Sequence, residues 1–295
     1  MKRNTFVDPF NGARGIYHFS SSHQETRRIF RSDKDFIFGV NTLALLLPGS
    51  RVKIIAYCLM DNHIHLLLCG TYKDCLEYYD KVTLRIAQML GKTYGISGVF
   101  RRDDLDVVAV TSESQLKSEI CYIHRNPYKA RMASPETYRW SSADVYFSNR
   151  IQHGSKVSGL GAAEIKRLFR THSKVPGTYE FEDGRILNSS FVFYKSTVEK
   201  FSGSVEYFDL LRRYSLEAEV EEAHGIHESV VFSDSELTER IKSICINEFH
   251  RESISMLDRK ELLRMARLIS YRYGAGRAQL ARILGVGKDV LERIL

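Results

Sequence analysis

Two apolar runs lie almost end to end early in the chain, over residues 52–60 and 64–70, and the first is rich in β-branched residues. Each has the length and composition of a strand, and only the polar tripeptide Asp61-Asn62-His63 separates them. A connection this short joins antiparallel neighbours, because parallel strands need a much longer crossover. The sequence therefore predicts a β-hairpin and, with it, an antiparallel sheet.

Further strands and helices surround this hairpin. The alternation of residues 14–20 and the β-rich run 106–111 predict two more strands. Helical spacing of apolar residues predicts helices over 33–47, 71–94 and 113–125, the last capped by Thr111 or Ser112 and ending at Asn126-Pro127. This order of elements is compatible with an α+β domain in which a ferredoxin-like antiparallel sheet packs on helices.

The charge of the chain changes along its length. The 295 residues carry a net charge of +7, and 43% of them are apolar, which is enough for one large core or two to three smaller ones. Residues 1–150 hold 21 basic and 15 acidic residues, residues 151–235 hold 10 and 13, and residues 236–295 hold 12 and 8. Two basic ends around an acidic middle suit a polyanion, so we expect two nucleic-acid-facing modules and a spacer.

Three segments follow from these patterns. We assign residues 1–150 to the sheet domain, 151–235 to a linker or small accessory region, and 236–295 to a mainly helical domain. The longest apolar runs are too short to cross a membrane, and the N-terminus does not resemble a signal peptide. The five cysteines are odd in number and lack a CxxC pair, which favours reduced thiols in a cytoplasmic protein over disulfides or a zinc site.

The first candidate site residues are His63 and His65. Residues two apart on a strand share a face, so both imidazoles can converge on one metal ion while Ile64 packs on the other face. Most His-x-His pairs are ordinary surface or core histidines. This pair stands directly after a turn at the start of a strand, which is the rigid support that a metal site needs.

Tyr122 is the second candidate. On a helix, residues four apart share a face, so Tyr122 and Asn126 can point to the same site. The alternative is that Tyr122, one of 16 tyrosines, simply packs in the core.

These groups suit phosphoryl transfer. A divalent cation held by His63, His65 and a polar oxygen would polarise a scissile phosphate. A tyrosine phenol, with an ordinary pKa of about 10, is a poor nucleophile until it is deprotonated or metal-activated. Attack by Tyr122 would give a phosphotyrosine that conserves the bond energy, so the strand could be rejoined.

The spacing of these motifs resembles the HUH-type single-tyrosine transposases of bacterial insertion sequences and their relatives, the REP-associated tyrosine transposases. That family reads Tyr-x-x-Met-x-Asn-His-x-His-Leu-Leu-Leu and later Tyr-Ile-His-x-Asn-Pro; residues 57–68 and 122–127 carry both patterns. The resemblance covers about residues 13–147. Further matching pieces are Tyr17-His18-Phe19, Arg28-Ile29-Phe30, Gly98-Val99-Phe100-Arg101 and Tyr138-Arg139-Trp140-Ser141-Ser142.

The resemblance implies a metal-dependent nickase that forms a 5′-phosphotyrosine on single-stranded DNA and often recognises a hairpin. By position, His63, His65 and Asn126 would be ligands of Mg²⁺ or Mn²⁺, and Tyr122 the nucleophile. His124 is an alternative ligand, although its spacing points it away from Tyr122. Asp61 replaces the small residue or proline usual at this turn, and it could disturb the turn or add a ligand. Candidate DNA contacts in this domain are Arg101, Arg102, Arg125 and Lys129.

The C-terminal segment predicts three short helices, over residues 260–273, 277–284 and 288–295, separated by glycine-containing turns. This layout is that of a helix-turn-helix, and it resembles the DNA-binding end of DnaA-type replication initiators. A helical bundle for dimerisation is the alternative. The expected core of the three helices is Ala281, Leu284, Val286, Val290, Leu291 and Ile294. The expected contacts of the helix-turn-helix to duplex DNA are Arg277, Arg282, Lys288 and Arg293.

The sequence is compatible with three functions. The leading one is a transposase, or a domesticated relative, that nicks and rejoins single-stranded or hairpin DNA. A non-catalytic DNA-binding regulator and a metal-dependent phosphodiesterase without strand transfer are the alternatives. The resemblance leaves open whether the chain forms a homodimer.

Overall fold

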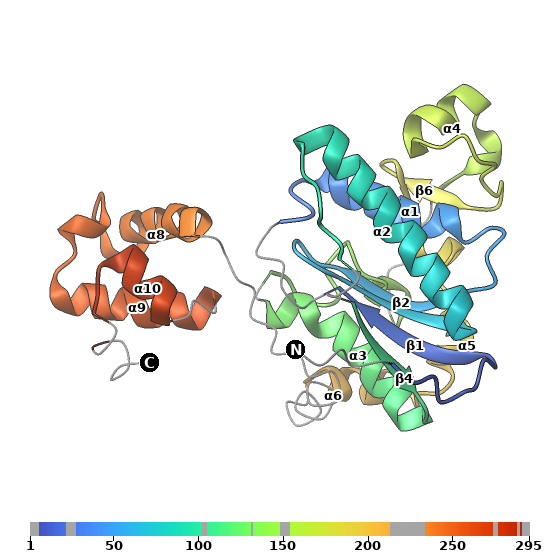
Figure 1. The fold of residues 1–295 in the computed structure, drawn as a ribbon, viewed down its shortest axis with the longest axis horizontal. Helices are drawn as coiled ribbons and strands as arrows, with labels where there is room; N and C mark the ends of the chain where they lie inside the picture. The colour runs from blue at the N-terminus through green and yellow to red at the C-terminus, as the bar shows by residue number, and fades with distance from the viewer. Residues whose placement is uncertain are drawn as a thin grey trace. The chain divides into compact units, whose positions relative to one another are not determined.

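The chain forms two compact units, each with its own hydrophobic core (Figure 1). The described residues up to 212 belong to the first unit and those from 234 onward to the second. The computed structural model describes residues 6–21, 28–101, 105–130, 132–147, 154–212, 234–273, 277–287 and 290.

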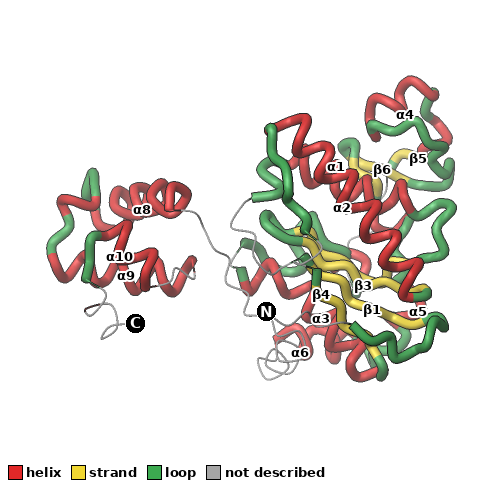
Figure 2. Tube along the Cα trace, viewed as in Figure 1, coloured by secondary structure: helices red, strands yellow, loops and turns green. Residues whose placement is uncertain are grey.

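The first unit is built on a four-stranded antiparallel sheet (Figure 2). Its strands are β1 (Gly15–Ser20), β2 (Lys53–Leu59), β3 (Ile64–Gly70) and β4 (Asp106–Val110), in the order β2-β3-β1-β4. Leu59 pairs with Ile64 across the hairpin, and the amide of Met60 donates to the carbonyl of His63 at 2.9 Å, which closes the turn. The predicted hairpin, the two further strands and the α+β class are confirmed.

Three helices pack on this sheet: α1 (Asp33–Leu46), α2 (Tyr72–Tyr94) and α3 (Glu113–Lys129). The Thr71 hydroxyl caps α2 by accepting from the amide of Asp74 at 3.1 Å. Gly95 ends α2 with φ 67°, a left-handed conformation that glycine adopts readily. Ser112 caps α3, as one of the two predicted caps, by accepting from Gln115 at 3.1 Å.

The predicted end of α3 is wrong, because the helix continues through Pro127 to Lys129. A proline inside a helix removes one N–H donor, here from the carbonyl of Ile123. Two local bonds support the continuation. The Asn126 side chain donates to the carbonyl of Tyr122 at 3.1 Å, and the amide of Ala130 donates to the carbonyl of Asn126 at 2.9 Å. Ile123 is fully buried, so its packing offsets the missing bond.

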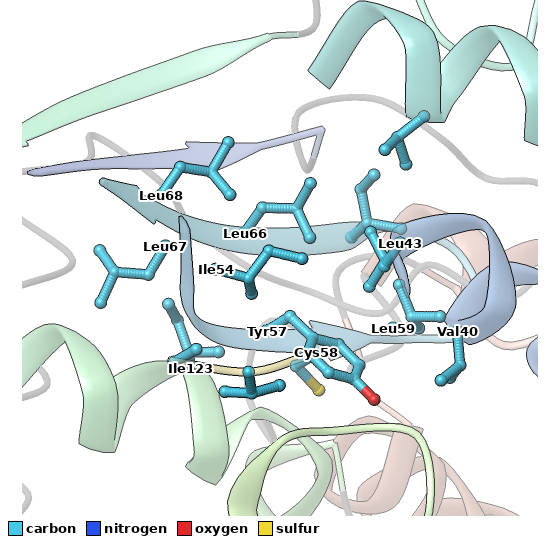
Figure 3. Packing of buried hydrophobic residues seen from close by; sticks show 14 of the residues in the cluster. Val40, Leu43, Ile54, Tyr57, Cys58, Leu59, Leu66, Leu67, Leu68 and Ile123 are labelled. Atoms are coloured by element: carbon cyan, nitrogen blue, oxygen red, sulfur yellow. The ribbon is translucent and has the colours of Figure 1, made fainter. Parts of the chain in front are cut away.

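The alternation of side chains on β1 and β3 gives the sheet two different faces. On one face, the ring of Phe19 stacks on Tyr79 of α2 at 5.5 Å between centroids. On the other, the ring of His65 lies 5.7 Å from Tyr122 of α3. Figure 1 shows α2 and α3 on opposite sides of the strands. In Figure 3, Leu66 and Leu68 point away from Leu67, which faces Ile123 of α3.

The described part of 151–235 is not a linker, because residues 154–212 are folded onto the sheet domain. The Asn41 side chain of α1 donates to the carbonyl of Gly184 at 2.7 Å and accepts from the amide of Ile186 at 2.8 Å. Val192 forms a parallel bridge with Ile54 of β2. The elements here are β5 (Ser155–Lys156), α4 (Ala162–Phe169), β6 (Glu180–Glu182), β7 (Arg185–Ile186), α5 (Lys195–Val198) and α6 (Ser204–Arg212), with 3-10 turns at Val157–Gly159 and Asn188–Ser190. A further 3-10 turn, Ala143–Val145, precedes the segment.

Asn188 joins this accessory segment to the sheet. Its Oδ1 accepts from the hydroxyl of Tyr57 at 2.5 Å, and its Nδ2 donates to the carbonyl of Ser141 at 2.8 Å and to Asp144 Oδ1 at 2.6 Å. Asn188→Ala leaves several buried polar groups without these bonds, so we expect a loss of unfolding free energy on the order of 3 kcal/mol. Urea unfolding followed by circular dichroism measures it. Tyr57→Phe removes only one of the bonds and should lose about 1 kcal/mol; equal losses would contradict the shared role of Asn188.

The second unit is helical. It contains α8 (Asp234–Phe249), a 3-10 turn (Ile254–Met256), α9 (Arg259–Tyr273) and α10 (Arg277–Leu284). The helices predicted over 260–273 and 277–284 are confirmed, and the one predicted over 288–295 lies outside the described residues except at 290. The core residues are Leu237, Ile241, Ile244, Cys245, Leu257, Met265, Ala266, Ile269, Leu280 and Leu284. Of the predicted core, Ala281, Leu284 and Val286 pack there and Val290 is half-buried, while Leu291 and Ile294 are not described.

Among the described residues, no helix has the length and apolar character needed to cross a membrane. The five cysteines form no disulfide, as expected of reduced thiols, and four of them are buried.

Candidate active site

Three histidines meet in the layer between the sheet and α3. His63 ends the hairpin turn, His65 follows on β3, and His18 lies on the neighbouring strand β1. The rings of His63 and His65 are 4.8 Å apart between centroids and nearly perpendicular, at 87°. The ring of His18 is 5.1 Å from that of His65. The strand geometry thus brings the two predicted histidines onto one side of the sheet together with a third.

Tyr122 of α3 joins this cluster. Its ring centroid lies 5.7 Å from that of His65 and 5.9 Å from that of His18, with edge-on geometry in both cases. The structure therefore brings together the predicted nucleophile and the His63–His65 pair, from segments almost 60 residues apart in the chain.

A chain of short polar contacts runs through the cluster. Glu119 Oε2 lies 2.8 Å from His18 Nδ1, and His18 Nε2 lies 3.0 Å from His65 Nδ1. All three side chains are essentially inaccessible to solvent. His63 Nδ1 lies 2.7 Å from Asn62 Oδ1. Sequence reasoning missed His18 and Glu119 as site residues. The available signals were the position of His18 in an alternating strand and the spacing of Glu119, three residues before Tyr122 on the helix.

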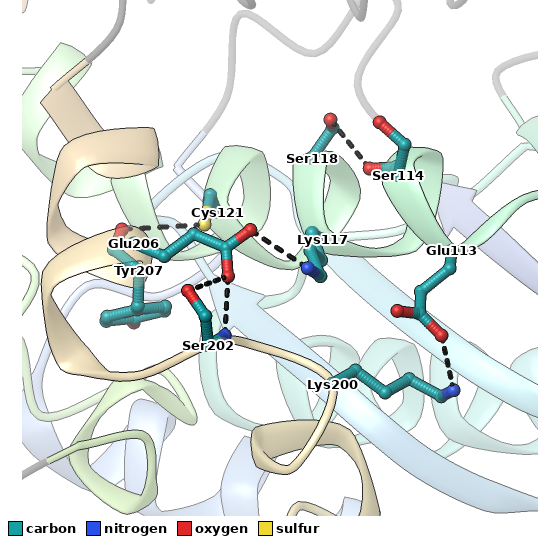
Figure 4. A network of polar contacts seen from close by, with 9 residues as sticks. All are labelled: Glu113, Ser114, Lys117, Ser118, Cys121, Lys200, Ser202, Glu206 and Tyr207. Carbon is teal, nitrogen blue, oxygen red and sulfur yellow. Dashed lines mark hydrogen bonds and ion pairs between the residues drawn. The ribbon is translucent and has the colours of Figure 1, made fainter.

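The accessory segment holds α3 from the side away from the sheet (Figure 4). Lys117 donates to Glu206 Oε1 at 2.9 Å, and Lys200 donates to Glu113 Oε2 at 2.8 Å. Hydrogen bonds lower the pKa of Glu206 to about 2; the largest effect comes from Lys117, and the next from the backbone and hydroxyl of Ser202. This carboxylate therefore stays charged at neutral pH. These contacts link α3, which carries Tyr122, to α6 and the residues before it.

His124 lies outside the cluster, so the structure does not support it as the alternative metal ligand. Its Nε2 is 2.8 Å from the hydroxyl oxygen of Ser142, and its Nδ1 is 2.8 Å from that of Tyr207. Burial lowers the pKa of His124 to about 3. The side chain therefore remains neutral and joins α3 to α6 and to residues 140–142, which run along the edge of β2.

The buried, neutral His124 predicts acid-sensitive stability. Its pKa rises from about 3 in the folded chain to an ordinary value near 6.5 on unfolding, so protons favour the unfolded state as the pH falls below about 6.5. We expect this residue to contribute a loss of about 2 kcal/mol between about pH 8 and about pH 5. Urea unfolding of wild type and His124→Gln at both pH values isolates the contribution. The variant should be less stable at pH 8 but lose less on acidification; parallel losses would contradict the prediction.

Asn126 lies one helical turn after Tyr122 and is 3% exposed. Its Nδ2 donates to the carbonyl of Tyr122 at 3.1 Å. The amide nitrogen is thus engaged within the helix, and Oδ1 is the atom that can serve as a cation ligand.

The donor set fits a cation that also binds a phosphate. A histidine held through Nδ1 presents Nε2 as the ligand nitrogen, which is the usual arrangement around a metal. Asn62 and His18 contact Nδ1 of His63 and His65 in this manner. In the part of the chain that the structure describes, no three His, Cys, Asp or Glu side chains are disposed to hold a metal ion. Besides histidine nitrogens, an amide oxygen, water and phosphate oxygens are ligands that Mg²⁺ and Mn²⁺ accept.

Asp61 supports the turn that carries His63 and does not disrupt it. Its Oδ2 accepts from Arg28 Nε at 3.3 Å. Its carbonyl accepts from the amides of Ile29 and Phe30, at 2.6 and 3.0 Å. The acidic residue and the Arg28-Ile29-Phe30 piece therefore belong to one local structure beside the histidines.

The predicted DNA contacts differ in accessibility. Arg101 is exposed, and so is Arg282 on α10. Arg125 is 6% exposed, so in this structure it is not a surface residue available to a phosphate. The side chains of Lys129 and Arg277, and the residues Arg102, Lys288 and Arg293, lie outside what the structure describes.

The candidate site is closed to solvent. Tyr122 is 3% exposed, His63 5% and His65 0%. A phosphate can reach the tyrosine oxygen only after the groups that cover it move.

Comparisons with known proteins give one weak likeness. No protein-family model matches the sequence, and no curated protein matches it. Among solved structures, a REP-associated tyrosine transposase bound to a REP hairpin aligns over 48% of this chain and 81% of its own, with 12% identity and a TM-score of 0.39. This score is below the level at which a likeness shows a shared fold.

Proposed function

We propose that the protein is a divalent-metal-dependent enzyme that nicks single-stranded DNA and transfers the strand through a 5′-phosphotyrosine at Tyr122. The observation that carries the proposal is the convergence of Tyr122 with His63 and His65 between α3 and the sheet. A nucleophile beside two potential metal ligands is the minimal arrangement for this chemistry. The substrate would be single-stranded or hairpin DNA, and the enzyme a transposase or a domesticated relative.

The reaction balances without any redox step. The phenol oxygen of Tyr122 loses its proton and forms a bond to phosphorus, while the bond from phosphorus to the 3′ oxygen breaks. The departing 3′ oxygen takes up a proton and becomes a free hydroxyl. Attack by a 3′ hydroxyl on the phosphotyrosine reverses these steps and joins the strand again.

The site residues divide the work. His63 and His65 would hold Mg²⁺ or Mn²⁺ through Nε2, with Asn126 Oδ1 as a third ligand. The cation would polarise the scissile phosphate and neutralise charge that develops on it. The sheet and α3 would set the separation between these ligands and Tyr122, and this separation would orient the phenol oxygen toward the phosphorus.

In this proposal the first unit is a ferredoxin-like nuclease domain and the second a helix-turn-helix domain. The element order β1-α1-β2-β3-α2-β4 and the strand order β2-β3-β1-β4 support a ferredoxin-like sheet. In the second unit, α9 and α10 with a further helix over 288–295 would form a helix-turn-helix that binds duplex DNA. Arg282, exposed on α10, is the described residue best placed to contact a phosphate.

A covalent-adduct assay tests the function. Wild-type protein is incubated with end-labelled single-stranded hairpin oligonucleotides, with Mn²⁺ or with EDTA, and resolved on a denaturing gel. We expect an adduct that forms only with metal, with the label retained when it lies 3′ of the nick. Cleavage without an adduct would identify a phosphodiesterase, and would overturn the tyrosine mechanism.

One observation favours a second function, a non-catalytic DNA-binding regulator. Tyr122, His63 and His65 are all buried, which is typical of core residues and unusual for groups that meet a bulky substrate. In that case the protein binds DNA equally well with and without metal, and no adduct forms with any oligonucleotide of a broad hairpin set. Metal-dependent adduct formation would exclude this function.

A further inference from the structure

The contact chain from Glu119 through His18 to His65 connects three elements. Glu119 belongs to α3, His18 to β1 and His65 to β3. The two contacts, 2.8 and 3.0 Å, are both short enough to be hydrogen bonds. The three residues are 0% exposed, so these contacts are formed in a dry interior where unsatisfied polar groups are costly.

The chemistry of imidazole fixes the direction of such a chain. If His65 binds a cation through Nε2, its proton must be on Nδ1, and Nδ1 then donates to His18 Nε2. His18 is then protonated on Nδ1, which donates to the carboxylate of Glu119. In this arrangement each N–H has an acceptor. In the reverse direction, His18 donates to His65 Nδ1, and the proton of His65 moves to Nε2, where it blocks metal binding.

We propose that His18 and Glu119 are positioning residues that hold His65 in the tautomer and orientation that bind the metal. This inference rests on the proposed function, and it adds two residues to the site that the His-x-His and tyrosine motifs do not contain. The two histidine ligands are supported differently. Asn62, the residue next to His63, supports that ring locally, whereas His65 is supported through a second histidine from another strand.

The same chain also ties the ligand strand to the nucleophile. Glu119 precedes Tyr122 by three residues on α3, about one helical turn, so both side chains lie on adjacent parts of the same helical face. Through His18, the carboxylate therefore links the helix that carries Tyr122 to the strand that carries His65. A purely structural role does not require this arrangement, because apolar residues of similar volume stabilise a core as well as a buried polar pair does.

Metal affinity and the tautomer of His65 test the proposal on the full-length chain. Free Mn²⁺ is counted by electron paramagnetic resonance during titration of wild type, Glu119→Gln and His18→Leu. Glutamine is isosteric but can turn its amide toward His18, which reverses the chain. We expect both variants to bind Mn²⁺ about 10- to 100-fold more weakly, the usual effect of removing support from a metal-binding histidine. His18→Gln keeps an acceptor at the former Nε2 and should retain most of the affinity.

A second readout needs no metal and no activity. Nitrogen-15 NMR of histidine-labelled protein distinguishes imidazole protonated at Nδ1 from imidazole protonated at Nε2. We expect His65 of the wild type to be protonated on Nδ1, and Glu119→Gln to shift it toward Nε2. The matched control is His124→Gln, which removes another buried histidine near Tyr122. The ring nitrogens of His124 contact Ser142 and Tyr207, outside the contact chain. It should change neither the affinity nor the tautomer.

The outcomes separate this inference from the proposed function. If folded Glu119→Gln and His18→Leu bind Mn²⁺ as tightly as the wild type, and the tautomer of His65 is unchanged, the positioning role is overturned. The proposal of a metal-dependent nuclease then still stands. Absence of Mn²⁺ binding by the wild type overturns both. Weaker binding by the two variants, near-normal binding by His18→Gln and an altered His65 tautomer support the proposal. If His18→Leu does not fold, Glu119→Gln and the tautomer measurement decide.

Discussion

Tyr122→Phe is expected to abolish covalent capture of DNA while leaving the folded structure intact. The change removes only the hydroxyl, which is the attacking group in the proposed reaction, and keeps the ring that packs against His18 and His65. Loss of a nucleophile removes an interaction needed at every turnover, so we expect adduct formation to fall by at least about 10³-fold. The unfolding free energy should change by only about 1 kcal/mol.

Three measurements make this prediction specific to the nucleophile. Adduct yield is followed over time with labelled hairpin oligonucleotides, DNA binding is measured by fluorescence anisotropy, and stability by urea unfolding. The matched control is Tyr128→Phe, an exposed tyrosine on the same helix, which should retain the wild-type adduct. Persistence of the adduct in Tyr122→Phe would contradict the assignment, and mass spectrometry of the adduct peptide would then identify the true nucleophile.

The hairpin that carries His63 and His65 was predictable because its cause is local. Two apolar runs of strand length and a three-residue connection leave little choice but antiparallel pairing. The convergence of His63 and His65 follows from the two-residue repeat of a strand in the same way. Approximate helix bounds were predictable for similar reasons. The end of α3 was not, because the side chain of Asn126 and the burial of Ile123 outweigh the local effect of Pro127.

The accessory segment was not predictable because its structure depends on distant partners. Its strands are two or three residues long, and so carry almost no periodic signal. Asn188 and Val192 take their places by contacts with Tyr57 and Ile54, more than 130 residues earlier. The sequence of 151–235 was therefore compatible with a linker, although its described residues are folded onto α1 and β2.

The support of His65 was missed for the same kind of reason. His18 reaches His65 only because β1 pairs with β3 in the register that places Ser20 opposite His65 and His18 opposite Leu67. A shift of one residue would turn His18 to the other face of the sheet. Register of this kind depends on the pairing of segments 45 residues apart. The stretch Tyr17-His18-Phe19 indicated a strand and did not indicate what the histidine contacts.

The ligand histidines give the second large effect that we expect. His65→Asn removes the Nε2 ligand, but the asparagine amide nitrogen can occupy the position of Nδ1 and still donate to His18. His63→Ala removes the other ligand at the hairpin turn, where its Nδ1 lies 2.7 Å from Oδ1 of the adjacent Asn62. Each change should reduce metal-dependent adduct formation by more than about 100-fold, because a lost ligand costs more than lost support for a ligand.

The form of the loss distinguishes ligands from general core residues. Each variant with one substitution retains one ligand histidine and should recover part of its adduct formation at high Mn²⁺. The double variant, His63→Ala with His65→Asn, should recover none. DNA binding by anisotropy should persist in all three variants, since the proposed role of these residues is in catalysis. If adduct formation by the wild type were unchanged in EDTA, the histidines would not be ligands. In that case their burial beside Tyr122 would identify them as core residues that pack against it, and the tyrosine would act without a metal.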